Sequence, residues 1–267
     1  MGSRFDDIDR ERILCIGDCH ITNDQDLSRF DVLSDYIIEE KPDHIILMGD
    51  FLTFQCLSGW DRNKRKLMEG QRYVLEVEAG NTALDKMMAG VLKYNKAKKR
   101  NRKSQYLPSM VYLNGNHEDR LDRYLDTEPT FEGVVSVQKD LRLAERGWQF
   151  IPYRSYHWIN EIGFTHIPFN KVREVSGVDI TRKASMVTVK SCVFGHTHEL
   201  HLSNSHRMGQ EHLQQVLNVG CFFEEHEKYV EGRVTNYWKG VVMLDSWKPG
   251  RFDISTTSLS SLRRKYE

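Results

Sequence analysis

The sequence lacks the features that place a protein in a membrane or in an oxidising compartment. None of its apolar runs approaches the about 18 residues that a membrane-spanning helix needs, and its first residues lack the apolar core of a signal peptide. Cysteines are few, odd in number and without CxxC spacing, which is typical of a reduced protein. They are Cys15, Cys19, Cys56, Cys192 and Cys221. We therefore expect a cytoplasmic location and no membrane partner.

An excess of charge of either sign is also missing. The 267 residues include 38 basic and 38 acidic side chains, so the chain as a whole does not attract nucleic acid. Residues 61–104 differ, because they hold 13 Lys or Arg and only 5 Asp or Glu, and seven of the eleven residues from Lys93 to Lys103 are basic. Two interpretations stay open: a helix with a solvated, positively charged end, or an arm beside the active site that attracts phosphates.

The basic segment contains an amphipathic pattern that predicts a helix. Apolar side chains recur at helical spacing, at Leu84, Met87, Met88, Val91 and Leu92. No repeat of fixed period and no low-complexity linker divides the chain, and its length and 39% hydrophobic content suffice for one core. We therefore predict a single domain over residues 1–267, with a basic helical insertion at about 61–104.

Short apolar runs that end in polar, metal-capable side chains recur along the chain. They are ILCIGDCH (13–20), HIILMGD (44–50), MVYLNGNHE (110–118), EIGFTHIP (161–168) and SCVFGHTHE (191–199). Such runs are typical of buried strands. Residues 28–43 have helical spacing, which makes a strand–helix–strand unit with the first two runs, and the second half of the chain is β-rich in pattern. The pattern predicts an α/β fold.

The polar residues after these runs form a mixed set of nitrogen and oxygen donors. Strand ends of an α/β sheet gather at one edge, so these residues are predicted to converge. The set comprises Asp18, His20, Asp50, Asn116, His117, His166, His196 and His198. Such donors suit Mn, Fe, Zn, Ni or Co, and their number exceeds what one ion with open positions uses. Two ions about 3.5 to 4 Å apart can hold a water as hydroxide and clamp a phosphate. The set indicates a dinuclear phosphoesterase.

The order of these motifs resembles the calcineurin-like metallophosphoesterase superfamily, whose signature is GDxH, GD, GNH(E/D), a single His and GHxH. This sequence has GDCH at 17–20, GD at 49–50, GNHE at 115–118, a lone His166 and GHTH at 195–198. The resemblance extends over residues 13–221, because VLNVGC at 216–221 is similar to the strand and glycine turn that follow GHxH. The basic insertion followed by GNHEDRLDRYL resembles phage and prophage members, which implies the host cytoplasm for a phage-encoded chain.

The resemblance implies a calcineurin-like four-layer α-β-β-α sandwich, with two mixed β-sheets flanked by helices. It also implies two divalent transition-metal ions at the strand ends, with Mn favoured and Fe, Zn, Ni or Co as alternatives. It assigns Asp18, His20 and His198 to one ion, Asn116, His166 and His196 to the other, and Asp50 to both. His117 is implied to bind no metal and to stabilise or protonate the departing oxygen.

The second motif differs from that of the serine/threonine protein phosphatases, which have GDxxDRG. Here the sequence reads GDFLTFQ, so Thr53 and Phe54 stand where that branch has the Asp that orients the catalytic histidine and the Arg that contacts phosphate. The difference disfavours a protein phosphatase and leaves the group that orients His117 unidentified. Arg120 and His201 are candidates for substrate binding.

The predicted function is hydrolysis of phosphodiester bonds, of nucleotides or nucleic acid, by attack of a hydroxide that bridges two metal ions. The basic segment favours a polyanionic substrate, either nucleic acid or a cyclic nucleotide. Two alternatives stay open: a phosphatase of small molecules or proteins, and a non-catalytic metal-binding scaffold of the same fold. The complete set of donors together with His117 favours an enzyme, because a scaffold has little use for a histidine that binds no metal.

Overall fold

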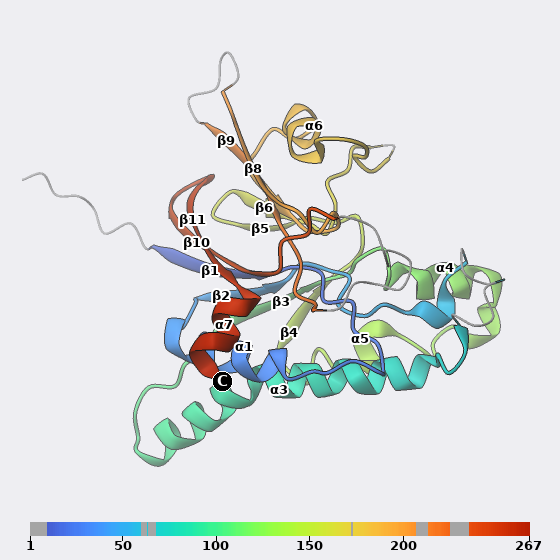
Figure 1. Cartoon of the computed structure of the whole chain (residues 1–267), viewed down its shortest axis with the longest axis horizontal. Coiled ribbons are helices and arrows are strands. Elements are labelled where there is room, and N and C mark those ends of the chain that lie inside the picture. Colours follow the sequence, from blue (N-terminus) through green and yellow to red (C-terminus); the bar gives the residue numbers. More distant parts are fainter. Residues whose placement is uncertain (1–9, 60–62, 64–67, 172, 207–212, 225–234) are drawn as a thin grey trace, which may run out of the picture.

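Two β-sheets with helices on their outer faces make up the part of the chain that the computed structural model describes, residues 10–59, 63, 68–171, 173–206, 213–224 and 235–267 (Figure 1). The strand orders are β11-β10-β1-β2-β3-β4 in one sheet and β5-β6-β7-β9-β8 in the other. The strands are β1 (Glu11–Ile16), β2 (His44–Leu47), β3 (Ser109–Leu113), β4 (Trp148–Ile151), β5 (His157–Ile159), β6 (Ile162–Phe164), β7 (Cys192–Phe194), β8 (Leu200–Ser205), β9 (Gln214–Val219), β10 (Gly240–Lys248) and β11 (Arg251–Ser258). The helices are α1 (Arg29–Glu40), η1 (Gln55–Leu57), α3 (Tyr73–Arg100), α4 (Asp119–Thr127), η2 (Pro129–Phe131), α5 (Val137–Asp140), α6 (Ile180–Val187) and α7 (Leu259–Tyr266).

The two sheets face each other across one apolar core. Ile46 and Val111 of the first sheet belong to the same buried cluster as Phe164 and Leu217 of the second. Another cluster lies between the first sheet and helices α1 and α3, and α6 packs on the second sheet through Ala184. Both sheets contain parallel and antiparallel pairs. In the first sheet β1 is parallel to β2 and antiparallel to β10, and in the second β9 is parallel to β7 and antiparallel to β8. The order of layers confirms the predicted α-β-β-α sandwich.

The strand–helix–strand unit at the start of the chain is confirmed. Helix α1 connects the parallel strands β1 and β2 and buries Phe30, Leu33 and Ile37 against the six-stranded sheet. It ends at Glu40, because the next residue, Lys41, has a φ of 46° that breaks the helical backbone one residue before Pro42. Because β1 and β2 run in the same direction, the polar residues that follow them leave the sheet at the same edge.

Helix α3 confirms the helix predicted for the basic segment, although residues 60–62 and 64–67 of that segment lie outside the described part. Leu84, Met87 and Val91 are buried, whereas Leu92 is 65% exposed and does not join the predicted apolar face. Helix α3 makes most of its contacts with α1, and Leu92 lies outside this contact because it is about 80° around the helix from Leu84. Among the described residues no helix combines the length and apolarity that crossing a bilayer requires.

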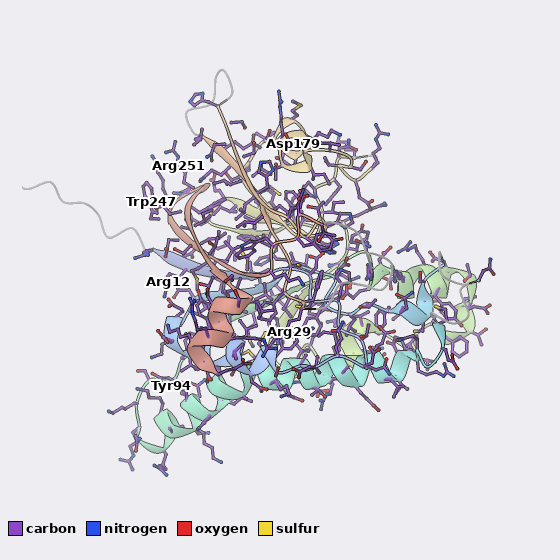
Figure 2. All side chains as sticks on the ribbon, viewed as in Figure 1. Arg12, Arg29, Tyr94, Asp179, Trp247 and Arg251 are labelled. Atoms are coloured by element: carbon purple, nitrogen blue, oxygen red, sulfur yellow. The ribbon has the colours of Figure 1, made fainter. Side chains whose placement is uncertain are left out.

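The basic end of α3 lies at the edge of the six-stranded sheet opposite to the motif residues (Figures 1 and 2). Tyr94 accepts a hydrogen bond from Lys41 at 3.0 Å, and Tyr106 donates one to the carbonyl of Pro42 at 2.6 Å. These residues precede the amino ends of β2 and β3, while the motifs follow the carboxyl ends. The interpretation of an arm beside the active site is therefore wrong, and the solvated helix end is confirmed.

Candidate metal centre

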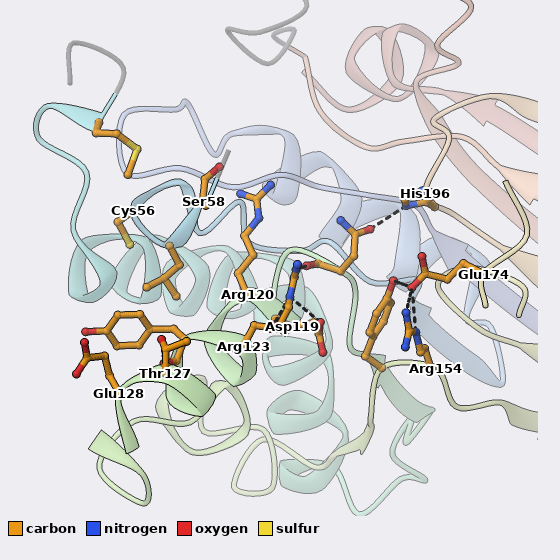
Figure 3. Close-up of a pocket in the computed structure, with 16 residues that line it drawn as sticks. Cys56, Ser58, Asp119, Arg120, Arg123, Thr127, Glu128, Arg154, Glu174 and His196 are labelled. Atoms are coloured by element: carbon orange, nitrogen blue, oxygen red, sulfur yellow. Dashed lines mark hydrogen bonds and ion pairs between the residues drawn. The ribbon is translucent and has the colours of Figure 1, made fainter. Parts of the chain in front are cut away.

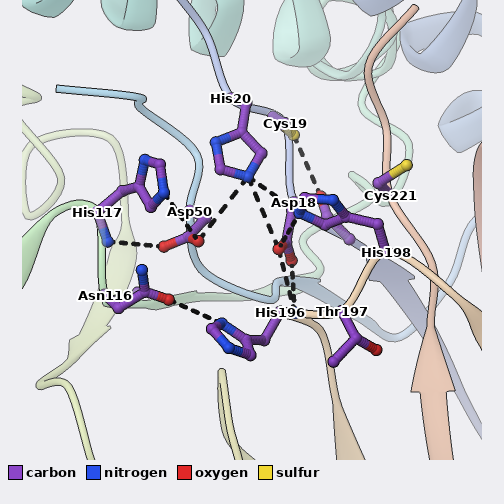
Figure 4. A network of polar contacts seen from close by, with 12 residues as sticks. Asp18, Cys19, His20, Asp50, Asn116, His117, His196, Thr197, His198 and Cys221 are labelled. Carbon is purple, nitrogen blue, oxygen red and sulfur yellow. Dashed lines mark hydrogen bonds and ion pairs between the residues drawn. The ribbon is translucent and has the colours of Figure 1, made fainter. Parts of the chain in front are cut away.

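All five motifs meet where the carboxyl ends of the two sheets come together. Figure 4 shows residues of four of them, and His166 of the fifth lies 2.8 Å from Asn116. A bridge between Asp18, after β1, and Cys221, after β9, joins the sheets at this point. The eight predicted residues follow β1 (Asp18, His20), β2 (Asp50), β3 (Asn116, His117), β6 (His166) and β7 (His196, His198). Seven of them, all except Asn116, make up three overlapping groups of candidate donors, and Asn116 lies against two of these histidines. The predicted convergence is confirmed, and the metal-binding role of each residue stays a prediction.

The first group consists of Asp18, His20 and His198, all buried. The Nε2 atoms of the two histidines lie 3.1 Å apart, and Asp18 Oδ2 lies 3.0 Å from Nε2 of His198. Ligands that surround one ion at about 2.1 Å lie about 3 Å from one another. The spacing of the donors therefore fits an ion between them.

The second group consists of His166, His196 and Asp50, with Asn116 beside them. Asn116 Oδ1 lies 2.8 Å from Nε2 of His166 and 2.8 Å from Nδ1 of His196, and these two nitrogens are 3.2 Å apart. Three donor atoms within about 3 Å of one another repeat the spacing of the first group. The family resemblance implied that Asn116, His166 and His196 form one set, and the structure brings these three residues together from the ends of β3, β6 and β7.

Asp50 lies between the two groups. Its Oδ2 atom is 3.3 Å from Nε2 of His166 and 3.8 Å from Nε2 of His20, so one carboxylate faces donors of both groups. Its Oδ1 atom accepts the backbone N–H of His117 at 2.9 Å, which fixes the orientation of the carboxylate. A carboxylate in this position is suited to bridge two ions.

The chemistry of the donors fits a divalent transition metal. Nδ1 of His166 donates to the carbonyl of Met48 at 3.0 Å, so its Nε2 is turned toward the other donors, an arrangement common among metal-binding histidines. The nearby thiols point elsewhere, since Sγ of Cys19 donates to the carbonyl of Gly17 and Sγ of Cys221 to that of Trp238. A set of imidazole, carboxylate and carboxamide donors suits Mn, Fe, Zn, Ni or Co better than metals that prefer thiolates.

Backbone strain is concentrated at the donors. His20, Asp50, His196 and His198 have φ values of 45°, 47°, 71° and 62°, in the left-handed region that non-glycine residues avoid. Such conformations cost on the order of 1 kcal/mol each and persist only where the surrounding structure holds them. Gly115 is one such constraint, because a Cβ atom there would lie 2.1 Å from Asp50 Oδ1.

Glu118 holds the turn that carries Asp50. Its Oε2 atom accepts the backbone N–H groups of Asp50 at 3.1 Å and Gly115 at 2.9 Å, and its Oε1 atom accepts that of Leu52 at 2.8 Å. Tyr112 donates its hydroxyl to the same carboxylate at 3.1 Å. Burial and the negative charge of Asp50 raise the pKa of Glu118 to about 7. The last residue of GNHE therefore orders the donors without facing the metal groups itself.

Buried charges of opposite sign stabilise one another inside the donor set. Burial disfavours the ionised form of Asp50, but the positive charges of His166 and His117 outweigh it and hold the pKa of Asp50 well below its usual range. Burial also disfavours a charged His166, yet Asp50 and Asp18 raise the pKa of His166 to about 10. Burial and the neighbouring His166 lower the pKa of His196 to about 4. The set thus favours positive charge next to Asp50, where a cation would bind.

His117 is oriented by a backbone carbonyl. Its Nδ1 donates to the carbonyl oxygen of Thr53 at 2.8 Å, which turns Nε2 toward Asp50 Oδ2 at 3.9 Å. Arg120 donates to the same carbonyl at 3.0 Å and has Nη2 3.2 Å from Nε2 of His117. The structure thus identifies the orienting group that the sequence left open. His117 also forms a possible group of donors with His20 and Asp50, so its exclusion from the metal site stays a prediction.

A cavity of about 870 Å³ opens from the second group of donors and runs along α4 (Figure 3). Asn116, His196 and Arg120 are among the residues that line it. Of the two candidates for substrate binding, Arg120 therefore lies beside the donors. His201 lies on β8, where Nδ1 is 2.7 Å from Oγ1 of Thr181, and it belongs to none of the donor groups.

The comparison with known families agrees with this geometry. The model of the calcineurin-like phosphoesterases matches residues 11–200, more than half of the chain. The chain belongs to the calcineurin-like phosphoesterase family. Membership of this family supports the predicted metal-dependent hydrolase. No curated protein matches the sequence.

Two solved structures resemble this phosphoesterase over most of its length at low identity. Vps29 of Entamoeba histolytica, in complex with zinc, is 11% identical with a TM-score of 0.38, and the match covers 93% of this chain and 99% of that one. The nuclease MPE of Pseudomonas putida is 12% identical with a TM-score of 0.32, and the match covers 91% of this chain and 87% of that one.

A buried arginine holds two segments that lie beside the candidate metal centre. Arg29, at the start of α1, is almost fully buried (Figure 2). It donates to the carbonyl of Phe222 at 3.1 Å and to that of Cys19 at 3.2 Å. One side chain thereby ties the segment after β1 to the segment after β9, although these strands belong to different sheets. The sequence offered no sign of this role, because an arginine in the first turn of an amphipathic helix is usually exposed.

A buried carboxylate of α3 holds the turn beside His117. Glu76 is fully buried, and its carboxylate accepts backbone N–H groups of Phe54, Gln55 and Cys56, which directly follow Thr53. Burial raises the pKa of Glu76 to about 7, and these N–H groups reduce the shift only in part. Helix α3 therefore contributes a buried carboxyl group to the turn that orients the histidine.

Glu76→Gln should change how stability depends on pH. A carboxyl whose pKa is raised from about 4.5 in the unfolded chain to about 7 in the folded one favours folding below the lower value, and this contribution is lost as the pH rises through 7. The loss amounts to about 3 kcal/mol. Between about pH 4 and about pH 8 the free energy of unfolding of the wild type should therefore fall by that amount relative to Glu76→Gln, measured by urea denaturation. A constant difference between the two proteins would contradict the burial of an ionisable Glu76.

Proposed function

We propose that this phosphoesterase is a dinuclear, metal-dependent phosphodiesterase that acts on nucleotides or nucleic acid. The observation that carries the proposal is the arrangement of two donor groups around one carboxylate, Asp50, with the imidazole of His117 beside it. Two sites in this relation suit the displacement reaction at phosphorus, because both the attacking and the leaving oxygen need stabilisation.

Each donor has a definite place in the proposal. Asp18, His20 and His198 would hold one ion, Asn116, His166 and His196 would hold the other, and Asp50 would serve both. Bound ions, with Mn as the first choice, would supply positive charge for the phosphate oxygens and lower the pKa of a water nucleophile. Glu118 and Arg29 keep the donors in place through the backbone.

His117 handles the proton of the leaving oxygen. The carbonyl of Thr53 keeps a proton on Nδ1, so the proton that is given to the substrate resides on Nε2. Asp50, at 3.9 Å, stabilises the positively charged form by its negative charge. In the free protein Nη2 of Arg120 donates to this nitrogen at 3.2 Å, so Nε2 carries its proton only after the N–H groups of Arg120 have turned to a phosphate oxygen of the bound substrate.

The diester preference is supported by the space beside the donors. The cavity of about 870 Å³ is far larger than a phosphate group and starts at Asn116 and His196, so a second ester group has room next to the donors. A nucleotide or a short strand of nucleic acid provides such a group. The alternative, a phosphomonoesterase, needs no space of this kind.

A panel of substrates tests the proposal. Mn-loaded protein is offered bis-p-nitrophenyl phosphate, p-nitrophenyl phosphate, 2′,3′- and 3′,5′-cyclic nucleotides, and single- and double-stranded DNA, and the values of kcat/KM are compared. We expect at least one diester to exceed the monoester by about tenfold or more, equivalent to about 1.4 kcal/mol. A monoester preference would replace the diesterase with a phosphatase, and absence of turnover with any substrate would favour the scaffold.

A further inference from the structure

The cavity beside the donors is lined by three arginines. Arg120 and Arg123 lie on helix α4, and Arg154 lies on the segment after β4 (Figure 3). Asn116 and His196, which lie in the second group of donors, line the same cavity. A substrate whose scissile phosphate lies at the donors would therefore have guanidinium groups from two elements of the fold near its flanking parts.

Two of the three arginines, Arg123 and Arg154, are held in place by acidic side chains. Arg123 is 3.0 Å from Oδ2 of Asp119 and donates to the carbonyl of Asn116 at 2.8 Å, while Arg154 is 2.8 Å from Oε1 of Glu174. Both guanidinium groups use Nε and Nη2 in these contacts, and no bond of Nη1 is found within the part of the chain that the structure describes. Each arginine thus keeps donors that can bind another anion.

The acidic partners do not exclude an anionic ligand. Arg123 and Arg154 are more than half exposed, and exposed ion pairs of this kind are worth at most about 1 kcal/mol. A guanidinium binds a phosphate with two parallel hydrogen bonds, which are stronger than such a pair. The carboxylates therefore orient the arginines in the free protein without blocking a phosphate.

An aromatic side chain lies next to the arginines. Tyr124 lines the cavity, is 36% exposed, and follows Arg123 on α4. Its ring packs at 6.4 Å from that of Phe131, which limits its movement. An accessible ring beside phosphate-binding groups suits an unpaired base, because every base can stack on an aromatic face. A base within a duplex is already stacked and does not offer its face.

We infer that this cavity binds the nucleotides that flank the scissile bond of a single-stranded nucleic acid, with Arg123 and Arg154 contacting phosphates and Tyr124 stacking on a base. The inference rests on the proposed phosphodiesterase activity and narrows its substrate from nucleotides in general to a strand of several nucleotides. A cyclic mononucleotide has one phosphate and would leave Arg123 and Arg154 without a phosphate to bind.

The experiment compares an oligonucleotide with a small diester. Arg123→Gln/Arg154→Gln and Tyr124→Ala are assayed on a single-stranded dodecanucleotide, its duplex and bis-p-nitrophenyl phosphate. The matched control is Lys96→Gln/Lys99→Gln, which removes two charges from the basic end of α3, about 30 Å of helix away from Glu76. We expect the ratio of kcat/KM for the single strand to that for the small diester to fall about tenfold or more in the arginine variant. It should also fall in the tyrosine variant and stay at the wild-type value in the control.

Salt dependence gives a second readout. The slope of log KM against log salt for the single strand should decrease by about 0.7 for each phosphate contact removed. An unchanged ratio in the arginine variant, or an equal loss on both substrates, would overturn the subsite and leave the phosphodiesterase proposal standing. A duplex cleaved as well as the single strand, with the same response to the variants, would overturn the single-strand assignment.

The two proposals can fail separately. If the wild type hydrolyses no substrate, the phosphodiesterase proposal is wrong, and the cavity is then tested by fluorescence anisotropy of a labelled single strand bound to the full chain. Binding that weakens in the arginine variant but not in the control supports the subsite. Binding that is equal in both, or undetectable in the wild type, overturns it.

Discussion

His117→Ala should lower kcat by about 10²- to 10⁴-fold while both metal sites stay filled, because a positioned acid contributes about this factor. The loss should depend on the leaving group. With p-nitrophenolate, which departs readily without a proton, the factor should be small, and with a ribose or other alkoxide oxygen it should be large. The measurement is kcat on a matched pair of diesters, together with elemental analysis of the purified protein.

The contacts of His117 make this a strict test. Its Nε2 lies with His20 and Asp50 in one of the three possible donor groups, so a role as metal ligand is the competing explanation. A ligand role predicts that His117→Ala loses metal and that the loss of activity is the same for every leaving group. Asn116→Ala provides the contrast, because removing that carboxamide should weaken one metal site, and excess Mn should partly restore activity.

Asp50→Ala should reduce metal content at both sites, since the carboxylate faces donors of both groups. Wild-type protein loaded with Mn is expected to hold close to two ions per chain. Changes beside a metal site already cost about 10- to 100-fold in affinity, so loss of a shared ligand should cost at least as much at each site. Elemental analysis and titration with Mn measure the stoichiometry and the apparent Kd.

Two further variants distinguish loss of the Asp50 charge from loss of the fold. Asp50→Asn keeps the shape and an oxygen acceptor for the N–H of His117 but removes the charge, so it should retain the fold and still lose metal. Asp85→Asn changes an exposed carboxylate of α3 and should bind metal like the wild type. A single ion in fully loaded wild-type protein, or loss of one site only in Asp50→Asn, would falsify the bridging role.

The strands and the donors could be predicted because their signals are local. Apolar runs such as residues 44–47 and 110–113 are buried strands, and each is followed within a few residues by its polar motif. Convergence followed from one general rule, that parallel strands present their carboxyl ends at a common edge. The amphipathic pattern of α3 was also local. It could not show how far the contact with α1 extends around the helix, and Leu92 lies outside that contact and is exposed.

The group that orients His117 had no signal in the sequence. It is the backbone carbonyl of Thr53, and every residue has a carbonyl, so only the left-handed turn that begins at Phe54 and its contact with the start of α4 select this one. The burial of two charged side chains also had no signal in the sequence. Glu76 and Arg29 lie on amphipathic helices, where charged residues are usually solvated, and their burial depends on segments far away in the chain.

The sequence by itself determined the family, the α/β class and the eight residues that meet at the candidate metal centre, because these depend on short motifs and on the direction of strands. Tertiary structure alone decided which atoms face one another and where the basic residues lie. Gly90 donates its backbone N–H to Ser34, which seats α3 along α1, and this direction carries its basic end away from the donors. Arginines of α4 and of the segment after β4 flank the donors instead, because packing brings together elements that no local pattern connects.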